Sequence, residues 1–134
     1  MLLPHGAIVA IADGENFELY RNTGNEAEPE LAAQPVPKLD SSNHSGGSHR
    51  SSPGNHADSI VGEDAHAAAV ATWLNGQVLS HKIKDLVVVA PPRTLGELRK
   101  HYHKMTGRAV IKELHKDLIG KQPSDILIAL REKH

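Results

Sequence analysis

The densest group of potentially reactive side chains lies between His44 and His56, in the stretch HSGGSHRSSPGNH. It combines hydroxyl, imidazole and guanidinium groups with a Gly-Gly pair and contains no bulky apolar residue. No serine here stands in the Gly-x-Ser-x-Gly motif of a serine hydrolase. No Lys-Ser or Lys-Thr follows the glycines, as a phosphate-binding loop would require. The residue types therefore leave two interpretations open, a functional loop or an unstructured insert.

Histidine is abundant, with ten residues in the chain, whereas cysteine is absent. His44, His49, His56 and His66 could converge on a metal if the loop folded back. Their spacing matches no common zinc pattern, and no thiolate is available to assist. We therefore favour histidines that face solvent, and we expect neither a metal nor another cofactor.

A second group of side chains is basic. Because the formal net charge is -1, the chain has no overall positive field, and contact with nucleic acid would need a local patch. The best candidates are Arg93, Arg99, Lys100 and Lys104. Arg93 precedes a predicted helix N-terminus, where free backbone donors favour anions. The others would lie along an exposed helix face, which is either an ordinary solvated surface or a weak site for phosphate and hence RNA.

The positions of the acidic residues argue against a two-metal nuclease, because such an enzyme needs several carboxylates close together. The apolar run Leu86 to Ala90, LVVVA, supplies none. Asp13 is expected in a turn, and Asp64 at the start of a helix as its cap. Two isolated acids with structural uses do not make a metal pair.

These side chains must be positioned by elements that the apolar pattern predicts. Thr94 and Glu97 form a predicted capping box at the start of one helix, which Gly107 would end. A region rich in Ser, Gly and His, 39–62, is expected to be a flexible loop. Strands are predicted over 7–12, 16–21, 30–36, 86–90 and 109–114, and helices over 64–80, from residue 94 and from residue 123.

The resulting order, β-β-β-α-β-α-β-α, predicts one α/β domain over residues 1–134, with a mixed five-stranded sheet and three helices. Pro35 and Pro37 place the third strand at a sheet edge. Ribonuclease-H-like folds use the same order. The N-terminus lacks the basic region of a secretory signal. No stretch approaches the roughly 18 apolar residues of a membrane span, so we expect a cytoplasmic protein.

Three segments resemble a known family. They are LVVVAPPRTLGELRKH, residues 86–101, followed by HKDL at 115–118, and the opening VAIADGENFELYRNTG. They are similar to bacterial proteins described as required for attachment to host cells. That family is regarded as a relative of the middle domain of archaeal and eukaryotic release factors and Pelota. The resemblance thus implies a release-factor middle-domain-like fold.

In release factors, the connection before the long helix carries Gly-Gly-Gln, which helps water to attack the peptidyl ester. The corresponding residues here are Gly46, Gly47 and Ser48, so the resemblance makes them weak catalytic candidates. Serine is shorter than glutamine, and the domains that read the codon are not evident, so we lean towards a protein that is not an enzyme.

The resemblance implies association with the ribosome or structured RNA, through His49 and Arg50 of the loop and through the basic helix. Neither DNA nor a membrane is an expected partner. One alternative is a protein-interaction module required for attachment to host cells. Another is a peptidyl-tRNA ester hydrolase that uses the Gly-Gly loop.

Overall fold

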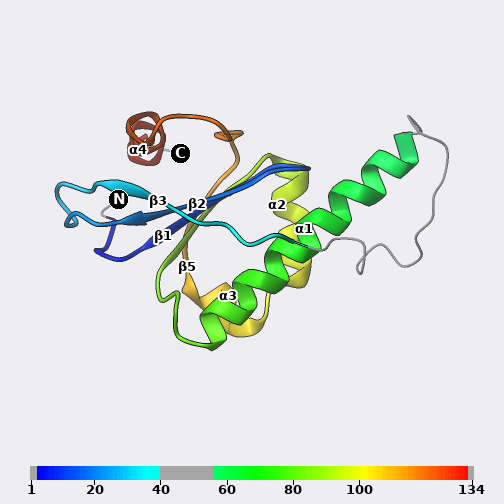
Figure 1. Ribbon diagram of the computed structural model, residues 1–134, viewed down its shortest axis with the longest axis horizontal. Coiled ribbons are helices and arrows are strands. Elements are labelled where there is room, and N and C mark those ends of the chain that lie inside the picture. Colours follow the sequence, from blue (N-terminus) through cyan, green and yellow to red (C-terminus); the bar gives the residue numbers. More distant parts are fainter. Residues whose placement is uncertain (1–2, 40–55, 133–134) are drawn as a thin grey trace.

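The computed structural model describes residues 3–39 and 56–132, with side chains from residue 62 onward in the second part (Figure 1). Its elements, in chain order, are β1 (Ile8–Ala12), β2 (Phe17–Asn22), β3 (Leu31–Gln34), α1 (His56–Leu79), β4 (Leu86–Val89), α2 (Pro92–His101), α3 (Lys104–Ala109), β5 (Val110–Leu114) and α4 (Pro123–Arg131).

The five strands form one mixed sheet in the order β3-β2-β1-β4-β5. β1 pairs antiparallel with β2 and parallel with β4, and β4 pairs parallel with β5. The predicted mixed five-stranded α/β sheet is confirmed. The third strand lies at the edge, as Pro35 indicated, because proline cannot donate to a neighbouring strand.

Helices cover both faces of this sheet. In Figure 1, α1, α2 and α3 lie on one side of the strands and α4 lies on the other. Alternate residues of β1 follow this division: Ile8 and Ala10 pack towards α1, whereas Val9 and Ile11 pack towards α4. β4 divides in the same way, and all four of its residues are buried. A continuous apolar run is the pattern expected of such a doubly covered strand.

α1 is the main helix of the core. Apolar residues at three- and four-residue steps predict one buried face for this helix, and the structure confirms it, since all of them are buried: Ala67, Val70, Ala71, Leu74 and Val78. The helix continues through Gly76 to Leu79 without a break. The predicted start at Asp64, and with it the end of the loop at residue 62, is wrong, because α1 begins at His56. Residues 56–63 contain no proline to stop a helix, but they carry little of the apolar periodicity that would have revealed one.

A break divides the predicted helix after β4 into α2 and α3, so the structure has four helices, not three, in the part of the chain that it describes. The side chain of Asn75 in α1 satisfies the backbone at this break. Its Nδ2 donates to the carbonyl of His101 at 2.8 Å, and its Oδ1 accepts from the N–H of His103 at 2.8 Å. The same Oδ1 accepts from the hydroxyl of buried Thr106 at 2.6 Å. α3 then continues past Gly107 to Ala109, so that glycine does not end the helix.

The predicted capping box is also wrong. α2 starts with Pro91 as its N-cap residue and Pro92 in its first turn, and no side chain caps it. Proline suits a first helical position because its missing N–H would have no partner there. Thr94 is instead buried within the first turn, and Glu97 pairs with Lys100.

The Asn75 contacts give a stability prediction. Replacing Asn75 with Ala removes three hydrogen bonds and leaves the Thr106 hydroxyl and two backbone groups without their partner. We expect the free energy of unfolding to fall by about 2–3 kcal/mol, measured by urea denaturation. Thr72→Ala, on the exposed side of the same helix, is the control and should change it by no more than about 0.5 kcal/mol. Equal stabilities for the two variants would contradict this role of Asn75.

Candidate nucleic-acid interface

The loop candidates Gly46, Gly47, Ser48, His49 and Arg50 lie outside the described residues, as do His44 and the side chain of His56. The structure does show where the flanking chain lies. Leu39 packs against the core cluster that α1 forms with the sheet. The chain is described again at the first residue of α1. Both flanks therefore belong to the side of the sheet that α1 covers.

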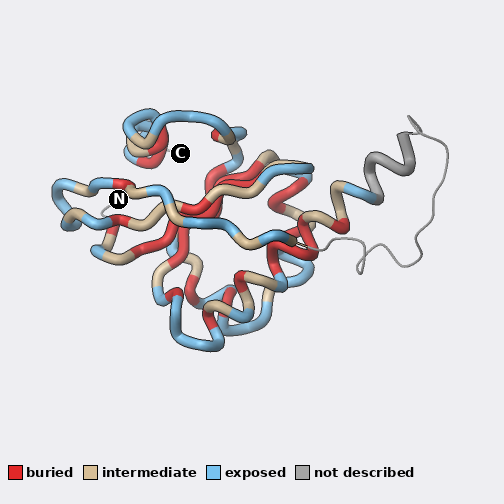
Figure 2. The backbone as a smooth tube through the Cα atoms, in the orientation of Figure 1, coloured by how far each residue is buried: buried red, intermediate tan, exposed pale blue. Residues whose placement is uncertain are grey.

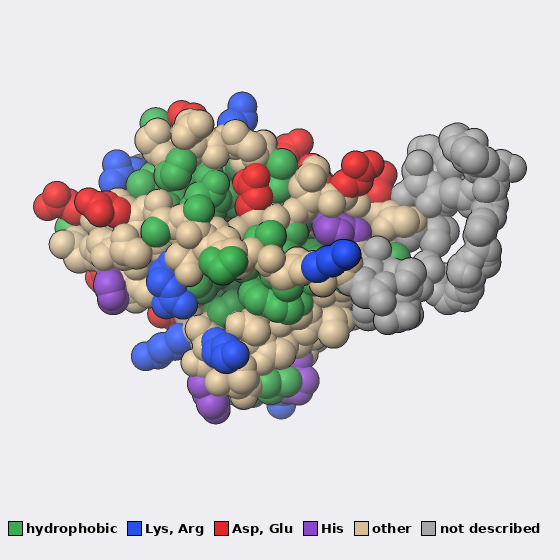
Figure 3. All heavy atoms as spheres, viewed as in Figure 1, with side chains coloured by type: hydrophobic (Ala, Val, Ile, Leu, Met, Phe, Trp, Pro, Cys, Tyr) green, Lys and Arg blue, Asp and Glu red, His purple; other side chains and the backbone are tan. Residues whose placement is uncertain are grey.

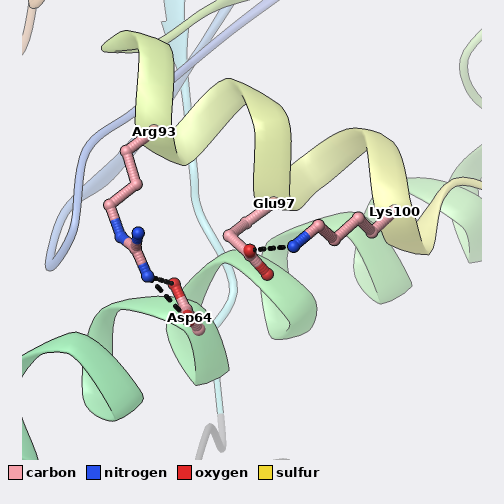
Figure 4. A network of polar contacts seen from close by, with 4 residues as sticks. All are labelled: Asp64, Arg93, Glu97 and Lys100. Atoms are coloured by element: carbon pink, nitrogen blue, oxygen red, sulfur yellow. Dashed lines mark hydrogen bonds and ion pairs between the residues drawn. The ribbon is translucent and has the colours of Figure 1, made fainter. Parts of the chain in front are cut away.

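Arg93, the second residue of α2, faces α1 (Figure 4). Its Nη2 donates to both carboxylate oxygens of Asp64, each at 3.0 Å. Asp64 lies inside α1, so the expectation that it caps the helix start is wrong. The side chains remain 54% and 34% exposed. This ion pair fixes the beginning of α2 beside the N-terminal half of α1.

The next two basic candidates also have acidic partners. Arg99 binds Glu113 of β5, with its Nε 3.0 Å from the carboxylate, and this hydrogen bond raises the pKa of Arg99. Lys100 lies 2.6 Å from Glu97 in the same helix (Figure 4). The hydrogen bond from Lys100 lowers the pKa of Glu97. Lys104 is exposed at the start of α3 and has no acidic partner among the residues that the structure describes.

The structure thus places the basic candidates on α2 and α3, but it pairs three of the four with carboxylates. A phosphate would have to share these cations with their partners. Arg93 can do so, because a guanidinium has five N–H donors and only Nη2 is engaged with Asp64. The acid then orients the guanidinium and leaves its other donors available to an anion.

Two histidines of this region have structural contacts. His103 is the N-cap residue of α3, and its Nδ1 accepts from the N–H of Met105 at 3.0 Å. His66 lies against the β1–β2 turn, with its Nε2 3.2 Å from the carbonyl of Asn16. Among the described side chains, residues 3–39 and 62–132, no three His, Asp or Glu come together as metal ligands.

Asp13 closes the β1–β2 turn, as predicted. Its carboxylate accepts from the N–H of Glu15 at 2.8 Å and from that of Asn16 at 2.6 Å, and the Asn16 amide donates to both of its oxygens. Partial burial raises the pKa of Asp13, but these hydrogen bonds together outweigh it, and the net pKa is lowered. Asp13 therefore has its acceptors committed to the turn.

A groove that the sequence did not reveal lies on the same face of the sheet as α1. Its volume is about 520 Å³, and its walls come from β1, β2, the end of β3, α1 and the α1–β4 connection. Arg21, Trp73 and Lys82 contribute to its lining. Strand alternation puts Arg21 on the same side as Phe17 and Leu19, and a cation on an apolar strand face is the signal in the sequence that could have indicated the groove. The contribution of Trp73 and Lys82 depends on contacts between distant segments.

The hydrogen bonds of Asp13 give a pH prediction. Because its pKa is lower in the folded chain, Asp13 contributes stability above its ordinary pKa of 3.8, and this contribution is lost as the pH falls through the folded value. In urea denaturation, the stability difference between wild type and Asp13→Asn should be largest near neutral pH and shrink below pH 3.8.

Glu15→Gln is the control for this experiment, because it removes a charge from the same turn but none of the hydrogen bonds to Asp13. It should keep the acid profile of the wild type. A difference between wild type and Asp13→Asn that stays constant across the acid range would contradict the assignment.

Comparison with known proteins identifies a family. Residues 6–130 match the family model described as bacterial archaeo-eukaryotic release factor family 12. A search of curated proteins finds no match. In the part of the chain that is described, no helix combines the length and apolar character of a membrane span. Because the match covers nearly all of the sheet and its helices, the chain belongs to bacterial archaeo-eukaryotic release factor family 12.

Proposed function

We propose that this chain is a cytoplasmic domain, equivalent to the middle domain of release factors, that associates with the ribosome or another structured RNA. Two regions make the contacts: the segment with Gly46, Gly47, Ser48, His49 and Arg50, and the basic side chains of α2 with Lys104. The observation that carries the proposal is the family match over residues 6–130, which points to a role related to translation.

The positions of the two regions support one interface. α1 begins at His56, where the loop segment joins it, and Asp64 follows eight residues later, about 12 Å along the helix axis. The ion pair between Asp64 and Arg93 holds the start of α2 beside this position in α1. The first basic side chain of α2 therefore lies about two turns of α1 from the loop's attachment, in the same half of that helix.

The charges of α2 favour weak, reversible binding to phosphates. Each phosphate contact must compete with a carboxylate: Asp64 for Arg93, Glu113 for Arg99 and Glu97 for Lys100. These are exposed pairs, and such pairs contribute only about 0–1 kcal/mol each, so a polyanion with several phosphates displaces them at little cost. Binding of this kind is steeply dependent on salt.

Binding, rather than ester hydrolysis, is the activity proposed. By the resemblance, Ser48 corresponds to the glutamine of release factors. Asp13, His66 and His103 have the structural contacts given above. The alternative is a protein-interaction module that supports attachment to host cells, which would bind a partner without RNA.

Ribosome cosedimentation across a salt series tests the proposal. The variant Arg93→Gln, Arg99→Gln, Lys100→Gln should bind more weakly than wild type at every salt concentration. If each residue contacts one phosphate, the slope of log affinity against log salt should become shallower by about 2, at roughly 0.7 for each contact with a single strand. The matched control is Lys116→Gln, Lys121→Gln, Arg131→Gln, which removes the same charge near α4 and should bind as wild type does.

Failure of the wild type to cosediment at low salt would overturn the proposal, as would equal losses in the two triple variants. Pull-down from nuclease-treated lysate distinguishes the alternative. Non-ribosomal partners that survive RNA digestion would favour the interaction module.

A further inference from the structure

The groove beside α1 has a composition unlike that of the α2 surface. Arg21 reaches it from β2 and Lys82 from the α1–β4 connection, and no acid is among the described residues that line it. Among the described residues, neither cation forms an ion pair with a carboxylate. Two cations near one cavity without an acid favour an anionic ligand, because each retains its full hydrogen-bonding capacity.

The remaining lining suits a flat apolar group with polar edges. Trp73 packs edge-to-face on Phe17, with ring centroids 5.7 Å apart, and is only partly buried, so that part of its indole borders the groove. Leu19 and Ile83 add apolar surface. Gln34 and Gln77 add amide groups that can both donate and accept hydrogen bonds.

The arrangement of the strands and helix brings these groups together. Leu19 pairs in register with Gln34 across β2 and β3, so their side chains share one face. Arg21 follows two residues after Leu19 on that face. Trp73 and Gln77 are four residues apart in α1, and therefore neighbours on one side of the helix. On the surface seen in Figure 3, hydrophobic and Lys or Arg side chains gather between β3 and α1.

We propose that this groove binds a nucleotide, with Arg21 and Lys82 on its phosphate and Trp73 against its base. The volume of about 520 Å³ lies in the range of small-ligand sites. Aromatic rings accept any nucleobase by stacking, and adjacent cations hold the backbone. The nucleotide is either free or part of a single RNA strand. The site is separate from the α1–α2 interface and does not depend on ribosome association.

The chain carries its own reporter, because Trp73 is its one tryptophan. Titrating the isolated protein with AMP or with a short single-stranded RNA should quench its fluorescence saturably. Adenosine tests the base without phosphate, and inorganic phosphate tests the anion without a base. Both should bind more weakly than AMP. Tighter binding of RNA than of AMP would identify a strand as the source of the nucleotide, and equal binding would identify the free nucleotide.

The variant Arg21→Gln, Lys82→Gln should weaken binding of AMP about tenfold or more, since hydrogen bonds to charged groups are the stronger ones. Lys121→Gln, Arg131→Gln removes two cations elsewhere and should bind as wild type does. Urea denaturation of each variant checks that the fold is kept. The proposal is overturned by absence of saturable quenching with both nucleotide probes, by equal affinity for AMP and phosphate, or by unchanged binding in the Arg21 and Lys82 variant.

Since the ligands here are free nucleotides and short RNA, a negative result leaves the cosedimentation experiment unaffected. Conversely, quenching by AMP in a protein that does not bind ribosomes would support the groove while contradicting the proposed function.

Discussion

The parallel pairing of β1 with β4 is the constraint on which the rest of the structure depends. Every residue of both strands is buried, and helices cover them on both faces (Figure 2). A titratable group placed there would lose its hydration without gaining a partner, at a cost of several kcal/mol. The two central strands consequently carry no titratable side chain. Functional groups lie instead where helices and strands leave the core. The α1–α2 contact and the groove beside β2 and β3 are two such places.

Much of the fold follows from local pattern. The continuous apolar run LVVVA predicts a strand covered on both faces. The alternation in NFELYR predicts that Phe17 and Leu19 face one way and Tyr20 the other, and the structure agrees. The buried face of α1 could be predicted from the sequence, because apolar residues recur along it at intervals of three and four residues. The start of α1 could not be predicted, since residues 56–63 carry little apolar periodicity in the sequence. The α2–α3 break escaped prediction because Asn75, which satisfies its backbone groups, lies 26 residues before His101.

The candidate site was harder to predict, because it too depends on contacts between residues that are distant in the sequence. Helix position correctly indicated that Arg99, Lys100 and Lys104 would be exposed, whereas Arg93 lies within α2 and not before it. Whether an exposed cation is available to a ligand depends on its neighbours in space, and Asp64 lies 29 residues before Arg93. Glu113 lies 14 residues after Arg99 and on a different element. The groove poses the same difficulty, because Arg21, Trp73 and Lys82 come from a strand, a helix and a connection.

The bridge made by Asn75 has a mechanical consequence. One amide group joins α1 to the end of α2 and to the beginning of α3, and the Asp64–Arg93 pair joins α1 to the opposite end of α2. The three helices are thereby braced at both ends of α2. Because the Asn75 amide satisfies backbone groups on both sides of the break after His101, this break is not free to act as a hinge. We therefore expect α1, α2 and α3 to move relative to the sheet as one unit.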